Sequence, residues 1–129
     1  MCLNESSVSQ VVLVADDDPD LVALVARRLR KAGYQVITAS DGEQALQMAT
    51  KLLPHLAVLD VAMPKLTGID VILRLRAIPA TQNMPVILIS AGFQDDITVR
   101  GLPVGAAGYI KKPFGPQELP NRVRAVLNR

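Results

Sequence analysis

Three short, uninterrupted apolar runs constrain the fold of this chain most strongly. Each has the length of a β-strand and lacks the alternation expected of a strand with one wet face. They are residues 11–15 (VVLVA), 56–59 (LAVL) and 86–89 (VILI). Such runs are typical of strands covered on both faces, inside a parallel sheet. Residues 35–39 and 108–111 are more polar, so we expect them to form flanking or edge strands.

Helical patterns separate these runs. The first predicted helix covers 19–32, turns Val22, Val25 and Leu29 to one face and closes at Gly33. A second covers 41–53; Asp41 and Gln44 form its capping box, and Pro54 ends it.

A third predicted helix starts at Thr67, with Asp70 as its capping partner, and ends before Pro79. Its predicted buried residues are Ile69, Ile72 and Leu73. A fourth, 94–102, is short and cut by Gly101 and Pro103, so we expect it to be the least stable.

The fifth predicted helix covers 116–128. Its inward residues are Leu119, Val123, Val126 and Leu127. Pro120 is expected to remove one hydrogen bond and distort the first turn. Strict alternation of strand and helix implies right-handed crossovers and a three-layer α/β sandwich.

Length and composition favour one domain, residues 11–129, preceded by a leader, 1–10. The chain has 129 residues, 50% of them hydrophobic, which suffices for a core without disulfides. Its single cysteine, Cys2, fits a reducing cytoplasm. Without a signal peptide pattern or an apolar run of about 18 residues, we expect a cytoplasmic protein away from membranes. The net charge is +2 with spread basic residues, which argues against direct nucleic-acid binding.

Reactive residue types follow four of the predicted strands: Asp16, Asp17 and Asp18 the first, Asp60 the third, Ser90 the fourth and Lys112 the fifth. The carboxyl ends of parallel strands share one edge, where ligands bind. Two carboxylates about 4 Å apart repel by roughly 4 kcal/mol at an effective dielectric of 20, so they must take up a proton or hold a cation. All-oxygen ligands indicate a hard cation, and a shallow site at the strand ends that leaves waters in place favours Mg²⁺ over Ca²⁺. Asp60 beside Mg²⁺ and Lys112 fits a nucleophile for phosphoryl transfer.

Four segments together resemble the receiver domain of bacterial response regulators, the CheY-like family. They are VLVADDDPD at 12–20, LAVLDVAMPKLTG at 56–68, PVILISA at 85–91 and GYIKKPF at 108–114. The resemblance covers about residues 11–127. It implies a doubly wound, five-stranded parallel sheet of order 2-1-3-4-5 with five helices, flavodoxin-like in topology.

The resemblance also implies a role for each metal ligand. Asp17 would bind Mg²⁺ directly, Asp16 would bind it through water, and Asp60 would be both ligand and phosphoacceptor. The backbone carbonyl of Ala62 would be a further ligand.

Three other residues receive roles by resemblance. Ser90 would hydrogen-bond the phosphoryl group, Lys112 would pair with Asp60 or its phosphate, and Tyr109 would be the switch aromatic. The bond between Lys112 and Pro113 is expected to be cis.

The implied function is two-component phosphorelay signalling. A sensor histidine kinase or phosphotransfer protein would phosphorylate Asp60, changing the surface formed by 94–102, 108–111 and 116–128 toward an unknown effector. We expect a monomer or weak dimer that catalyses only its own phosphotransfer and dephosphorylation. The alternatives are a non-phosphorylated scaffold of the same fold and a Mg²⁺-dependent aspartyl-phosphate phosphatase. The phosphatase would need a second Asp where Ala62 stands.

Simpler interpretations remain for single residues. Asp18 before Pro19 fits a helix cap, and Tyr109 fits a half-buried strand aromatic that never switches. His55 has no neighbouring His or Cys and is expected at the surface without a function.

The chain also departs from the family pattern. Lys65-Leu66-Thr67-Gly68 makes a bulkier, more charged loop after the acceptor. In the family, the side chains two residues beyond Asp60 and two beyond Ser90 tune the lifetime of the phosphoryl group. Here they are Ala62 and Gly92, which leaves that lifetime open. Ala107-Gly108 stand where DNA-binding, dimer-forming regulators often have acidic residues before the switch aromatic.

Overall fold

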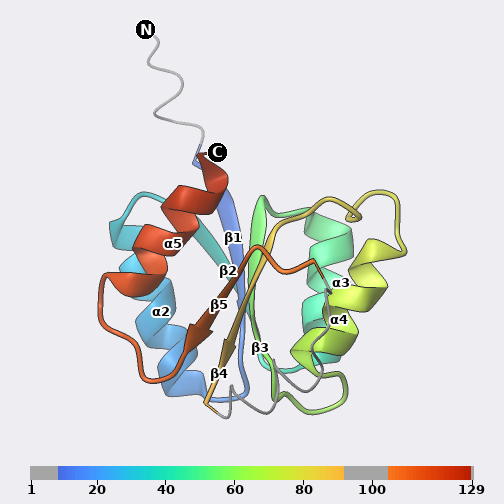
Figure 1. The fold of residues 1–129 in the computed structure, drawn as a ribbon, viewed down its shortest axis with the longest axis horizontal. Coiled ribbons are helices and arrows are strands. Elements are labelled where there is room, and N and C mark those ends of the chain that lie inside the picture. Colours follow the sequence, from blue (N-terminus) through green and yellow to red (C-terminus); the bar gives the residue numbers. More distant parts are fainter. Residues whose placement is uncertain (1–8, 92–104, 129) are drawn as a thin grey trace, which may run out of the picture.

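A five-stranded sheet lies between two layers of helices in the computed structural model (Figure 1). The structure describes residues 9–91 and 105–128. Its elements are β1 (Val11–Ala15), α2 (Pro19–Lys31), β2 (Gln35–Ala39), α3 (Gly42–Leu52), β3 (Leu56–Asp60), α4 (Gly68–Arg76), β4 (Val86–Ser90), β5 (Gly108–Lys111) and α5 (Glu118–Leu127). The predicted helix 94–102 lies outside the described residues.

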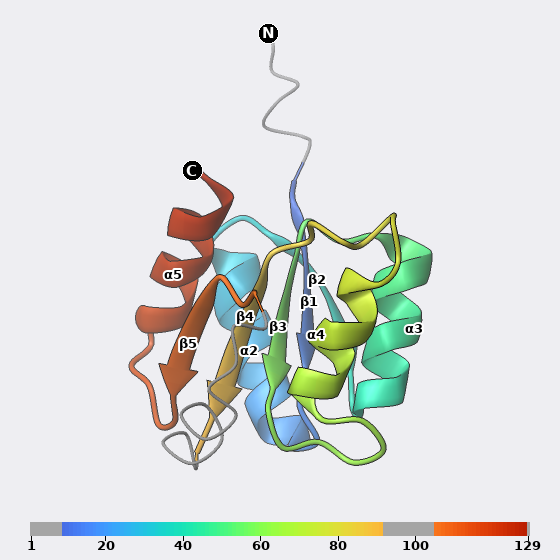
Figure 2. The same cartoon turned by 45° about the vertical axis from the view of Figure 1, so that its right-hand side comes forward.

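The strand order is β2-β1-β3-β4-β5, and every neighbouring pair is parallel. This confirms the order that the resemblance implied. The three apolar runs form the interior strands β1, β3 and β4, while the more polar β2 and β5 form the edges (Figure 2). β3 and β4 are buried along their whole length, because helices cover both faces.

Two apolar cores fill the spaces between the sheet and its helices. Residues alternate along β1, so Val12 and Val14 face α2 and α5, whereas Leu13 and Ala15 face α3 and α4. Figure 1 shows these helix pairs on opposite faces. Within residues 9–91 and 105–128, no helix combines the length and the apolar character needed to cross a bilayer.

The first two helices begin close to their predicted positions, with one difference in capping. The Asp18 carboxylate caps α2 by accepting from the amides of Asp20 and Leu21. In α3, Asp41 accepts from the amide of Gln44 at 2.7 Å as predicted. The Gln44 side chain, however, accepts from the amide of Ser40, also at 2.7 Å. The reciprocal half of the expected capping box is therefore shifted one residue toward the N-terminus.

The capping box of α4 is confirmed, but one of its predicted buried residues is wrong. Thr67 and Asp70 exchange side chain to backbone hydrogen bonds of 3.1 Å each. Leu73 is 52% exposed, whereas Val71 and Leu75 are buried completely. Leu73 stands two positions from each of these residues, which places it on the opposite side of a helix with 3.6 residues per turn.

The expected loss of a helical hydrogen bond at Pro120 was also wrong, because α5 begins two residues later than predicted. Glu118 is its first residue, which makes Pro120 the third. The first four amides of a helix have no partner within it, so Pro120 removes no helical hydrogen bond. Asn121 makes the first such bond, donating to the carbonyl of Gln117 at 3.0 Å. Leu127, predicted to point inward, packs against the core and is half-buried.

Candidate functional site

Reactive side chains gather at one edge of the sheet because all five strands point to it. Asp60 is the last residue of β3, and Ser90 is the last of β4. Asp16 follows β1, and Lys112 follows β5. The sequence placed each of these residues at a strand end, and the parallel topology brings those ends to a common edge.

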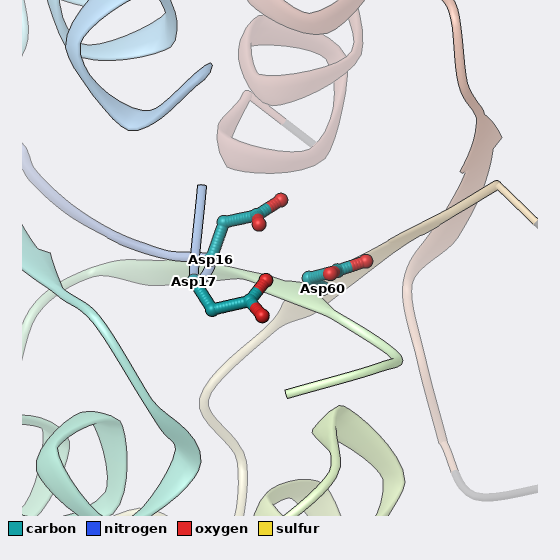
Figure 3. Close-up of side chains that lie close together, drawn as sticks. All are labelled: Asp16, Asp17 and Asp60. Atoms are coloured by element: carbon teal, nitrogen blue, oxygen red, sulfur yellow. The ribbon is translucent and has the colours of Figure 1, made fainter. Parts of the chain in front are cut away.

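Three carboxylates form the acidic centre of this edge. Asp16, Asp17 and Asp60 each offer one oxygen, and these oxygens all lie within 4.8 Å of one another. Figure 3 shows the three side chains close together at the ends of β1 and β3. Asp16 and Asp60 are 1% and 4% exposed, whereas Asp17 is exposed. Two carboxylates are thus held out of water, and the third faces it.

The ammonium group of Lys112 lies between the two buried carboxylates. Its Nζ is 2.9 Å from Asp16 Oδ2 and 3.4 Å from Asp60 Oδ1. Lys112 was expected to pair with Asp60, but the shorter contact is to Asp16. The other oxygen of Asp16 accepts from the amide of Asp18 at 3.0 Å. Asp16 is therefore the better compensated of the two buried acids.

Burial and like charge act on Asp60. Burial first, and then the charge of Asp16, raise the pKa of Asp60 to about 6, and Lys112 only partly opposes them. Burial alone lowers the pKa of Lys112, but its hydrogen bond to Asp16 and the charges of Asp60 and Asp16 outweigh it and raise that pKa. Without a metal the site therefore has too little positive charge. Three carboxylates of this kind fit a hard divalent cation such as Mg²⁺.

The loop after Asp60 is held against two elements. Gly68 donates to the carbonyl of Val61 at 2.9 Å, and a Cβ at Gly68 would lie 2.5 Å from the carbonyl oxygen of Asp60. In the middle of the loop, the carbonyl of Pro64 accepts from the amide of Gly42, the first residue of α3, at 3.2 Å. The role of Gly68 as a close neighbour of Asp60 was missed from the sequence, although its position just after the Thr67 cap was visible there.

Lys65 does not add its charge to the acidic centre. Its ammonium group lies 3.8 Å from the carboxylates of both Asp41 and Glu43 at the start of α3. Its backbone is left-handed, with φ of 71°. The extra charge noted in the sequence is thus directed toward α3.

The remaining predicted site residues lie on β4 and β5 or just after β3. Ser90 is 1% exposed, and its carbonyl accepts from the amide of Lys112 at 2.9 Å. Ala62 is exposed two residues beyond Asp60. Tyr109 is half-buried on the edge strand β5 and packs against the core under α3 and α4. The Lys112–Pro113 bond is cis, as expected.

His55 lies away from this edge and has a structural role. Its Nδ1 accepts from the amide of Val11 at 2.9 Å, and its own amide donates to the carbonyl of Val11 at 2.8 Å. His55 therefore attaches the turn before β3 to the start of β1.

Comparison with known proteins identifies the family. The response regulator receiver domain matches residues 12–124. The chain is 43% identical over 122 residues to the alkaline phosphatase synthesis transcriptional regulatory protein PhoP of Bacillus subtilis, covering 95% of this chain and 50% of PhoP. It is 46% identical over 118 residues to the transcriptional regulatory protein PrrA of Mycobacterium tuberculosis, covering 92% of this chain and 50% of PrrA. This chain belongs to the response regulator receiver domain family of two-component signalling.

Solved structures agree with this assignment. A putative response regulator from Chloroflexus aurantiacus superimposes with a TM-score of 0.87 at 36% identity, over 95% of this chain and 100% of that one. The receiver domain of the sensor histidine kinase PA1611 from Pseudomonas aeruginosa also superimposes with a TM-score of 0.87. Its sequence identity is 25%, over 95% of this chain and 100% of that one. That structure has a magnesium ion coordinated in its active-site cleft. The chain spans about half the length of the curated relatives it matches.

Proposed function

We propose that Asp60 accepts a phosphoryl group and that the chain is a phosphorylation-dependent switch. The donor is a phosphohistidine of a sensor histidine kinase or of a phosphotransfer protein, or a small acyl phosphate. The observation that supports this most directly is the meeting of Asp16, Asp17 and Asp60 within 4.8 Å, with Lys112 in contact with two of them.

The proposed reaction is a direct displacement at phosphorus. An Asp60 carboxylate oxygen forms a bond to phosphorus, the bond from phosphorus to the donor's imidazole nitrogen breaks, and its electron pair stays on that nitrogen. Asp60 must be ionised to attack, and a pKa of about 6 leaves it mostly ionised at neutral pH. Lys112 already lies 3.4 Å from Asp60, so its charge is in position to balance the added phosphate.

Four residues are proposed metal ligands: Asp17 directly, Asp16 through water, Asp60, and the backbone carbonyl of Ala62. Bound Mg²⁺ would supply positive charge to the phosphoryl oxygens. Ser90, at the end of the neighbouring strand β4, is proposed to hydrogen-bond the phosphoryl group.

The output is proposed to be a change of the surface made by residues 94–102, β5 and α5, with Tyr109 as the switch aromatic. Tyr109 is on the edge strand and half-buried, so its side chain has access to both core and solvent. We place the chain in the cytoplasm, as a monomer or weak dimer whose chemistry is limited to its own phosphotransfer and dephosphorylation. The names of PhoP and PrrA, both transcriptional regulators, make transcriptional control the proposed output of the whole protein.

Incubation with acetyl phosphate and MgCl₂ tests this proposal by intact-protein mass spectrometry. We expect one phosphoryl group on the wild-type chain and none on Asp60→Asn. Asp20→Asn is the matched control, because Asp20 is an exposed carboxylate on α2 outside the cluster. Labelling of Asp60→Asn at the wild-type rate would reject Asp60 as the acceptor.

A further inference from the structure

The strand β2 leaves one side of the sheet open. It is an edge strand, with β1 as its neighbour. The amide of Gln35 and the carbonyl of Ala39 bond to the chain at the two ends of β1, at 3.0 and 3.2 Å. The backbone groups of a strand point alternately to its two sides. Val36 and Thr38 therefore turn their N–H and C=O groups away from the sheet.

The side chain of Arg30 confirms this direction and covers part of the edge. It reaches from α2 and donates to the carbonyl of Val36 at 3.2 Å. Thr38 is exposed, and the described part of the chain offers no hydrogen-bond partner to its amide or its carbonyl. Charged side chains placed over an edge strand limit its pairing with other chains. The edge of β2 is thus covered at Val36 and open at Thr38.

A groove of about 590 Å³ runs along the open part of this edge. Its wall is mostly apolar where α2 contributes Val22, Ala23 and Ala26, and Gln44 lines it from α3. Because α2 and α3 cover opposite faces of the sheet (Figure 1), a groove that both helices line must cross the edge of β2. A mostly apolar groove of this size, with a few polar groups, is typical of a binding site.

The two ends of the groove carry opposite charge. Asp16 and Asp17 of the acidic centre line it where β2 ends, and Arg30 lines it near the start of β2. Within residues 9–91 and 105–128, no carboxylate oxygen lies within 4.0 Å of the Arg30 guanidinium. A ligand extended along the edge is therefore favoured when it is positive beside Asp17 and negative beside Arg30.

We propose that an extended segment of a partner protein adds to the sheet as an antiparallel strand beside β2. One residue of that segment exchanges both of its backbone hydrogen bonds with Thr38, as a hydrogen-bonded pair of an antiparallel ladder does. This pairing uses the two groups that β2 leaves open and keeps the bond between Arg30 and Val36. It is independent of phosphorylation, since Asp60 does not line the groove.

The register of this pairing predicts the side chains of the segment. Val36 packs in the core under α2, so Thr38, two residues on, lies on the same side of β2. The partner residue opposite Thr38 then faces α2 and contacts Val22, which favours an apolar side chain. Two residues earlier the segment lies near Asp17, and two residues later it lies near Arg30. The expected pattern is basic, any residue, apolar, any residue, acidic.

The test is an NMR titration of the ¹⁵N-labelled full chain in EDTA with the capped peptide Lys-Thr-Val-Thr-Glu. We expect saturable amide shifts in β2, largest at Thr38, at millimolar peptide. An N-methyl group on the Val nitrogen, whose N–H faces Thr38, should abolish binding. An N-methyl group on the second Thr of the peptide, whose N–H faces away, should change the affinity less than twofold. Equal binding of the two methylated peptides would overturn the proposal, because backbone pairing would then play no part.

Substitution of Thr38 tests the same pairing from the side of the protein. Proline is tolerated on an edge strand where its missing N–H would face solvent, so Thr38→Pro should keep the fold. Its circular dichroism checks this, and its affinity for the peptide should fall at least fivefold. Thr38→Val keeps the backbone groups and should bind as the wild type does. A folded Thr38→Pro chain with wild-type affinity would contradict the proposed pairing.

A mutant cycle tests the orientation of the segment. Replacing the Glu of the peptide by Gln should weaken binding to the wild type about two- to fivefold and leave binding to Arg30→Gln unchanged. Arg27→Gln is the matched control, because Arg27 is exposed on α2 outside the groove and its variant should keep the wild-type response. An equal response of all three proteins would overturn the antiparallel orientation.

Two further outcomes decide the occupant. Asp60→Asn should bind the peptide as the wild type does, which separates this proposal from the phosphoacceptor proposal. Absence of a saturable shift in the wild type would overturn the proposal. Shifts in β2 that grow with protein concentration in the absence of peptide would also overturn it, in favour of a second copy of this chain.

Discussion

The acidic centre formed by Asp16, Asp17 and Asp60 lowers the stability of the folded chain. Asp60 is almost fully buried, and Lys112 shares its charge between Asp60 and Asp16. Burial and the charge of Asp16 raise the pKa of Asp60 to about 6. An ionised Asp60 is therefore less stable in the folded chain than in the unfolded one. The proposed binding of a cation and a phosphoryl group would offset this cost, because both would change the charge balance of the site.

A pH prediction follows from the raised pKa of Asp60. Between about pH 4 and 6 the folded state keeps a proton that the unfolded state releases, so this group's contribution to stability falls as pH rises and is constant above about 6. In EDTA at pH 7.5, Asp60→Asn should raise the free energy of unfolding by on the order of 1 to 3 kcal/mol. Urea unfolding followed by circular dichroism at several pH values measures this difference.

The difference between Asp60→Asn and wild type should shrink as the pH falls from 6 toward 4, because the folded state keeps its proton while the unfolded state begins to take one up. Asp20→Asn is exposed and should show no such trend. A gap between Asp60→Asn and wild type that stays the same from pH 4 to 7.5 would contradict the assignment of the raised pKa to Asp60.

At the scale of elements, the junction between β3 and α4 controls the position of Asp60. The Thr67 capping box sets where α4 begins, which places Gly68 against the backbone of Asp60. The Gly68 amide then bonds to the carbonyl of Val61. Local sequence predicted the cap correctly. The approach of the helix to the strand depends on the packing of α4 on the sheet, which local sequence does not specify.

Gly68→Ala tests this junction. Alanine is the better helix former, yet its Cβ would lie 2.5 Å from the Asp60 carbonyl oxygen, so we expect a loss of about 1 to 3 kcal/mol in unfolding free energy. Gly115→Ala is the control, because a Cβ there meets nothing within 4 Å. Its effect should stay within about 0.5 kcal/mol. Equal stability of the two variants in urea unfolding would show that α4 moves away freely.

At the scale of the whole molecule, the sheet brings together residues far apart in sequence. Lys112 contacts Asp16 across 96 positions. The acidic centre therefore exists only in the folded state. A cation that binds all three of its carboxylates must stabilise the folded state by mass action.

Magnesium should accordingly raise the stability of the whole chain. At a free concentration 100 times its dissociation constant, Mg²⁺ is expected to add about 2.7 kcal/mol to the unfolding free energy. Circular dichroism is the suitable probe, since the chain has no tryptophan. Asp17→Asn should lose most of the increase in unfolding free energy that Mg²⁺ gives the wild type, whereas Asp20→Asn should keep all of it. Samples without Mg²⁺ contain NaCl at the same ionic strength. An equal gain in all three proteins would indicate a general salt effect.

The sequence by itself determined the interior strands, the edge strands and the side chains that end them. An unbroken apolar run such as 86–89 is buried on both sides only when its strand lies between two helical layers. Asp60 directly follows another such run, 56–59, so the sequence alone placed it at the end of an interior strand. Tertiary packing decided the rest. Lys112 lies closer to Asp16 than to Asp60, Leu73 is exposed, and Gly68 lies against the backbone of Asp60. These depend on how elements far apart in sequence pack together, and local periodicity and capping carry no information about those distances.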